Sequence, residues 1–94
     1  MFDKIDGQLN DWLKTRNLHL QKLYKEEEVR SISVVTVKGN KYQIWLDEVK
    51  KNMIKINVWD YGKLKVEYTT TLPLFIETMD KAYDMIYSVW EQHR

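Results

Sequence analysis

The sequence predicts an α+β two-layer sandwich, in which a four-stranded antiparallel meander is flanked by an N-terminal and a C-terminal helix. Apolar residues recur every three or four positions near both ends of the chain, which is the helical period. From Val29 to Thr70 apolar and polar residues alternate instead, which is the period of a strand. Because 94 residues can close one core, we expect a single domain over residues 1–94.

The N-terminal segment has the spacing of an amphipathic helix. Its apolar residues share one stripe: Phe2, Ile5, Leu9, Trp12 and Leu13. After an interruption at Arg16 and Asn17, the pattern continues with Leu20, Leu23 and Tyr24. We therefore predict one long helix to about residue 26, with a break near Asn17.

Turn signals divide the alternating region into strands near 29–38, 41–48, 52–60 and 63–70. "KGNK" at 38–41 is typical of a hairpin whose two loop residues are Gly39 and Asn40, and Gly62 in "WDYGK" suits a short loop with a bulge. Placing the apolar residues on one face sets Leu46 opposite Ile54 and Ile56 opposite Val66.

The C-terminal segment "TTTLPLFIETMDKAYDMIYSVWEQHR" predicts a second amphipathic helix. Thr71 can cap it and Pro73 suits its first turn. Its apolar stripe is Ile76, Met79, Tyr83, Ile86 and Trp90.

Strand alternation places Trp45 and Trp59 on the sheet face opposite the core residues. With a two-residue loop at Gly39–Asn40, Ile32 and Val34 join them, beside Asp47 and Trp45. Gln43, Asn57 and Lys65 cross the middle of this face, and charged residues surround the tryptophans: Lys41, Lys55, Lys63 and Glu67. Such apolar content predicts that something covers the face.

Four interpretations of this face remain open. A helix or the lysine stems cover the rings, or the face is a protein-binding or dimer interface with a polar rim. Alternatively, the rings stack on the bases of a single-stranded nucleic acid whose phosphates meet Lys41, Lys55, Lys63 and Lys65. The last interpretation is a small-molecule pocket between sheet and helix, lined by Tyr42, Tyr68 and Tyr83.

Residue types for catalysis and metal binding are sparse. Without cysteine there are no disulfides and no thiolate sites, and neither His19 nor His93 has a carboxylate at an orienting spacing. Glu77, Asp80 and Asp84 share a helix face, which is typical of a solvated surface. Three glycines cannot form a phosphate-binding loop. We expect no enzymatic activity, no cofactor and no metal site.

Charge and hydropathy bound the partners and the location. The net charge of +1 creates no general attraction to nucleic acid or to an anionic membrane. The sequence has neither a signal-peptide pattern nor an apolar run of membrane-spanning length. We therefore expect a cytoplasmic protein with no membrane partner.

The order of helices and strands resembles that of the double-stranded RNA-binding domain. That family opens its second helix with a lysine-rich motif, whereas "TLPLFIETMDKAYD" is apolar and acidic here. We therefore do not assign the chain to it. In size and composition the chain looks like bacterial immunity proteins, phage accessory proteins and secretion chaperones, although no motif specifies a family. The leading hypothesis is a non-enzymatic module that binds a protein partner or a second copy, and the alternative is a single-stranded nucleic-acid binder.

Overall fold

The computed structural model describes residues 2–24, 29–50 and 52–93. Helix α1 (Phe2–Thr15) precedes strands β1 (Leu20–Tyr24), β2 (Val29–Val35), β3 (Lys41–Lys50), β4 (Met53–Asp60) and β5 (Lys63–Thr71). The 3₁₀ turn η1 (Leu72–Leu74), helix α2 (Phe75–Met85) and the π-helical segment η2 (Ile86–Trp90) follow. Each strand pairs antiparallel with the next in chain order, so the sheet is an open meander. The predicted α+β class, with a meander between two helices, is confirmed.

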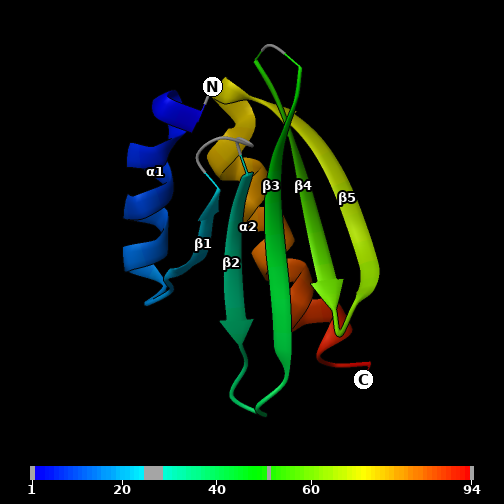
Figure 1. The fold of residues 1–94 in the computed structure, drawn as a ribbon. Coiled ribbons are helices and arrows are strands. Elements are labelled where there is room, and N and C mark those ends of the chain that lie inside the picture. The colour runs from blue at the N-terminus through cyan, green and yellow to red at the C-terminus, as the bar shows by residue number, and fades with distance from the viewer. Residues whose placement is uncertain (1, 25–28, 51, 94) are drawn as a thin grey trace.

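One hydrophobic core lies between the sheet and the helices (Figure 1). The helices contribute Phe2, Ile5, Leu9, Trp12, Leu13, Phe75, Met79, Ala82 and Ile86 to it. The sheet contributes Ile32, Val34, Tyr42, Ile44, Leu46, Ile54, Ile56 and Val58. Because both helices pack on the same side of the sheet, the other side, here called the outer face, carries neither of them.

The first helix ends where the sequence is interrupted. Asn17 adopts a positive φ of 55°, and the Leu18 amide donates to the Leu13 carbonyl at 2.9 Å. The Asn17 amide donates to the Lys14 carbonyl at 3.2 Å, which completes a Schellman motif. A chain that leaves the helix through a left-handed residue cannot continue it, so α1 stops at Thr15.

The prediction of helix from residue 16 to residue 24 is therefore wrong, and residues 25 and 26 lie outside the described residues. Residues 20–24 instead form a fifth strand, β1, at the edge of the sheet. Leu20 pairs with Ile32 and Leu23 with Arg30, with a bulge between Leu20 and Lys22. Because of the bulge, Leu20 and Leu23, which are three positions apart, pair with residues only two positions apart on β2. A separation of three is also typical of a helix, so the sequence pattern resembles a helical one.

The loop between β2 and β3 is longer than predicted. It runs from Thr36 to Asn40, closed by the Thr36 amide donating to the Asn40 carbonyl at 2.9 Å, with Gly39 at a φ of 87°. As a result Val34 pairs with Tyr42, whereas the two-residue loop had set it beside Trp45. The register shift is three residues, and an odd shift moves every side chain of the strand to the other face.

The placement of Ile32 and Val34 on the outer face is consequently wrong. Both side chains are fully buried in the core, where Ile32 pairs with Ile44. Val35 and Val37, which the two-residue loop would have turned toward the core, are 60% and 102% exposed.

The other strand pairs differ from the prediction by an even number of residues. Leu46 pairs with Ile56, and Ile56 pairs with Tyr68, each two positions away from the predicted partner. An even shift keeps side chains on their face, so the core residues of these strands remain core residues. A bulge beside Val58 then brings Leu64 opposite Trp59.

Candidate binding face of the sheet

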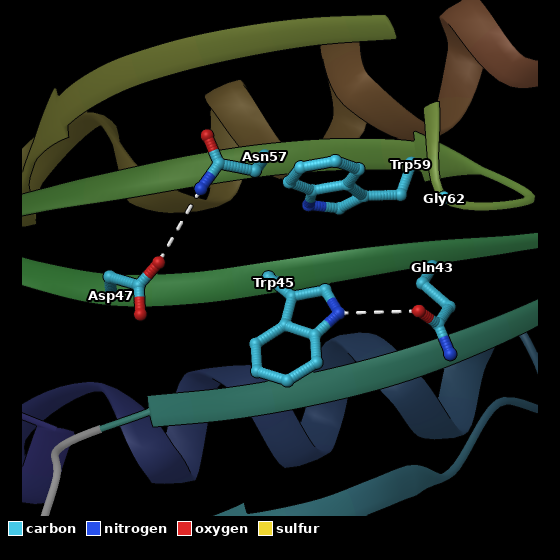
Figure 2. Close-up of a pocket in the computed structure, with 6 residues that line it drawn as sticks. All are labelled: Gln43, Trp45, Asp47, Asn57, Trp59 and Gly62. Atoms are coloured by element: carbon cyan, nitrogen blue, oxygen red, sulfur yellow. Dashed lines mark hydrogen bonds between the residues drawn. The ribbon is translucent and has the colours of Figure 1, made fainter. Parts of the chain in front are cut away.

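Trp45 on β3 and Trp59 on β4 both lie on the outer face and are partly exposed. Trp45 pairs with Asn57 across the two strands, and Trp59 pairs with Gln43. Figure 2 shows the Trp59 ring extending toward Asn57 and the Trp45 ring extending toward β2, both on the side of the sheet turned away from the helices. The structure thus leaves these two large rings uncovered by α1 and α2.

The rings border an open hollow of about 330 Å³. Its lining comes from two adjacent strands and the following turn: Gln43, Trp45, Asp47, Asn57, Trp59 and Gly62. Gly62, with a φ of 80°, allows the tight turn between β4 and β5. Since two of the six liners are tryptophans, the hollow can accept a flat group against an indole ring.

Hydrogen bonds within the hollow are long and incomplete. The Trp45 Nε1 donates to Gln43 Oε1 at 3.4 Å, and Asn57 Nδ2 donates to Asp47 Oδ2 at 3.4 Å (Figure 2). Asn57 is 8% exposed, and its Oδ1 is buried without a hydrogen-bond donor in the described part of the chain. A buried acceptor without a donor costs about 1–3 kcal/mol of stability.

The charge of the hollow comes from Asp47. Burial raises the pKa of the Asp47 carboxyl, and the nearby Lys55 opposes that change to a smaller degree. Lys55 pairs with Asp47 in the register, but its Nζ lies 3.6 Å from the Glu67 Oε1. The carboxylate therefore shares the hollow with two indoles, while the Lys55 ammonium lies near Glu67.

The predicted rim residues lie on or near the outer face with different neighbours. Lys55 and Glu67 form the ion pair already described, and the cross-strand neighbour of Lys55 on β3 is Asp47. Lys41 lines a smaller hollow of about 200 Å³ with Gln43, Tyr61 and Gly62. Lys63 is the cross-strand neighbour of Asp60 in the strand register, next to the β4–β5 turn.

Four liners of the hollow were not among the predicted binding residues: Gln43, Asp47, Asn57 and Gly62. Alternation had already placed Gln43, Asp47 and Asn57 on the outer face, which was the available signal. Their contact with the tryptophans depends on the register, because Asn57 lies opposite Trp45 only after the two-residue correction.

The helix side of the molecule contains two satisfied polar clusters. Asp80 accepts the Trp12 indole N–H at 2.8 Å and pairs with Arg16. Glu91, which is 5% exposed, accepts hydrogen bonds from the side chains of Thr36, Asn40 and Tyr42. Hydrogen bonds, first of all that from Thr36, lower the pKa of Glu91. These carboxylates hold the helices and the β2–β3 loop together.

The other predicted features have structural roles or exposed positions. Tyr42 is fully buried and donates to Glu91, and the Tyr83 ring packs edge-on against Trp12 and Tyr87, so a common ligand pocket gains no support from these tyrosines. His19 and His93 are exposed. Within residues 2–24, 29–50 and 52–93, no group of three His, Asp or Glu could hold a metal ion. None of the helices in these ranges is long and apolar enough to cross a membrane.

The chain matches no protein-family model, no curated protein and no solved structure. The geometry of the outer face is therefore the basis on which a function can be argued.

Proposed function

We propose that this protein is a non-enzymatic, cytoplasmic binding module that contacts another protein chain, either a partner or a second copy, through the outer face of its sheet. The observation that carries the proposal is the pair of partly exposed tryptophans, Trp45 and Trp59, which line one hollow on a face that neither helix covers. Lys41, Lys55, Lys63 and Glu67 surround them as a polar rim. Aromatic centres with polar rims are typical of protein interfaces.

The chemistry of the lining supports binding over catalysis. Two indoles, two amides and one carboxylate line the hollow, which contains no pairing of a nucleophile with a base. Trp45 and Trp59 would act as hot spots, because truncating a buried interface tryptophan commonly weakens binding by about 2 kcal/mol or more, roughly 30-fold.

The test compares wild type with a Trp45→Ala/Trp59→Ala variant. Sedimentation velocity along a dilution series measures self-association, and cross-linking with mass spectrometry measures capture of other proteins. We expect the double variant to lose whichever contact the wild type makes. Leu74→Ser is the matched control, because Leu74 is 51% exposed in η1, between β5 and α2. Unchanged self-association and unchanged capture in the double variant would show that the outer face is not the binding surface.

Single-stranded nucleic acid is the second candidate, favoured by the two partly exposed indole rings and by Lys41 in the adjoining hollow. Asp47 counts against it, since the ionisable liner of the main hollow is an anion that would repel phosphate. Binding to an oligonucleotide should then fall steeply as salt rises, because each neutralised phosphate releases counterions. Absence of binding at low salt would eliminate this candidate.

A further inference from the structure

The Asp47 carboxylate in the outer-face hollow has room for further hydrogen-bond donors. It can accept about four hydrogen bonds and receives one from the described residues, at 3.4 Å from Asn57 Nδ2. Asp47 also sets the orientation of the Asn57 amide, because the reverse orientation would place two oxygen atoms against each other. Asn57 Oδ1 is therefore turned away from Asp47, where it is buried without a donor in the described part of the chain. A ligand that supplies N–H donors would complete the Asp47 carboxylate.

The negative charge of Asp47 favours a cation among such ligands. Asp47 is the ionisable liner of the hollow, and Lys55, which could neutralise it, is held near Glu67. Burial raises the pKa of Asp47 more than Lys55 lowers it, so a cation placed close to this carboxylate would favour its ionised form. A cation against the neighbouring indole rings would also gain a cation–π interaction.

The rest of the chain shows which cation fits an aromatic ring beside an aspartate. The Arg16 Cζ lies 4.3 Å from the centroid of the Trp12 ring, and its guanidinium pairs with Asp80. Asp80 also accepts the Trp12 N–H, so ring, carboxylate and guanidinium form one unit.

The same arrangement recurs at Arg30. Its Cζ lies 4.6 Å from the centroid of the Phe2 ring, and its Nε and Nη2 donate to the two oxygens of Asp6 at 3.1 and 3.0 Å. Both arginines are thus occupied within the fold. The outer hollow has the rings and the aspartate of this unit but no arginine among its liners.

We propose that this hollow binds the guanidinium group of an arginine presented by the partner protein, stacked on Trp45 or Trp59 and donating to Asp47. This inference rests on the proposed protein-binding function. Arginine fits better than lysine, because its planar fork can lie on an indole and donate two parallel hydrogen bonds to a carboxylate, whereas an ammonium is a compact, strongly hydrated charge. Figure 2 shows Asp47 and Trp45 on the same strand, with Asn57 Nδ2 directed toward the carboxylate.

The test uses blocked amino acids as probes and the indole N–H signals of the protein in two-dimensional NMR. N-acetyl-arginine methylamide should shift the signals of Trp45 and Trp59 saturably and leave that of Trp12, already stacked by Arg16, in place. The citrulline analogue has nearly the same shape without the charge, and it should shift neither signal. The lysine analogue should bind more weakly than arginine.

Asp47→Asn should weaken arginine binding about tenfold, the loss expected for one charge-assisted hydrogen bond. Glu48→Gln removes an equal charge one residue away, but Glu48 pairs with the core residue Ile54 and so belongs to the opposite face. It should leave the affinity unchanged. Equal shifts with arginine and citrulline, no saturable shift, or an undiminished affinity in Asp47→Asn would each overturn the inference.

Failure here is distinguishable from failure of the proposed function. If the Trp45→Ala/Trp59→Ala variant loses self-association or partner capture while arginine shifts neither signal, the face binds protein and the arginine inference alone is wrong. If the same variant changes neither property, the proposed function fails as well.

Discussion

Truncation of two adjacent valines tests the register on which the outer face depends. Val34 is fully buried and Val35 is 60% exposed. Val34→Ala removes two buried methyl groups, at about 0.8 kcal/mol each, and leaves a small cavity, so we expect a loss of about 2 kcal/mol. Val35→Ala removes the same atoms from a site that is mostly in water, and we expect a loss of about 0.6 kcal/mol. Both variants exchange the same residue types in one strand, so the difference isolates burial.

Urea unfolding followed by circular dichroism measures both losses. With a slope of about 1 kcal/mol per molar urea, Val34→Ala should lower the midpoint by about 2 M and Val35→Ala by about 0.6 M, with unchanged slopes. A larger loss for Val35→Ala than for Val34→Ala would refute the reasoning. It would support the two-residue loop at Gly39–Asn40 and return Val34 to the outer face.

Three further predictions concern polar groups. Since the pKa of Glu91 is lowered from its usual 4.5, its ionised form stabilises the fold above that value and the stabilisation is lost as pH falls through the folded-state pKa. In wild type the urea unfolding midpoint should fall as the pH is lowered from about 6 to about 3, and Glu91→Gln should reduce that fall. An equal fall in both proteins would contradict this. Asn57→Val removes the acceptor without a donor and should raise stability by about 1 kcal/mol in urea unfolding, whereas a loss would mean that the amide is satisfied. Asp80→Ala should cost about 1–2 kcal/mol by leaving the Trp12 N–H unpaired, and Asp84→Ala, the control on the same helix, should cost less than about 0.5 kcal/mol; equal losses would exclude a special role for Asp80.

Sequence periodicity was sufficient for the fold class because the core faces of most elements carry long apolar patterns. The stripe of α1 and the alternation of β3 and β4 each specify one face, and the structure buries those residues. β1 was not predicted because Leu20 and Leu23 are three positions apart, which is a helical spacing, and only the bulge makes that spacing compatible with a strand. In the sequence, the end of α1 appears only as an interruption of the apolar pattern near Asn17. That interruption ends the helix because Asn17 adopts a positive φ, which the pattern does not reveal.

The loop between β2 and β3 shows what periodicity alone cannot decide. In "SISVVTV" both Ile32 with Val34 and Val35 with Val37 are apolar pairs two residues apart, so either pair could face the core. The length of the loop between β2 and β3 decides which of the two pairs faces the core. Gly39 and Asn40 suit a two-residue turn locally, but Asn40 donates to Glu91 of the C-terminal segment, and Thr36 does so too. That long-range contact favours the wider loop, and no local pattern contains it.

For the outer face, the sequence was sufficient to predict which residues of β3 and β4 lie on it, but not which of them are neighbours, and it placed Ile32 and Val34 there wrongly. Even register shifts leave Trp45, Trp59, Asp47 and Asn57 on the same side whichever partner each one has. The neighbours then decide the chemistry, because Asn57 rather than Lys55 lies opposite Trp45, and an acceptor replaces a cation beside the ring.

Asn57 is the liner of that hollow that departs from what stability alone would favour. A sheet face selected for stability would carry valine or threonine there, since both suit a strand and neither leaves a buried amide oxygen without a donor. The asparagine lowers stability locally, and such departures from local rules are expected at functional sites. Its Nδ2 donates to Asp47, the carboxylate on which the proposed arginine contact depends.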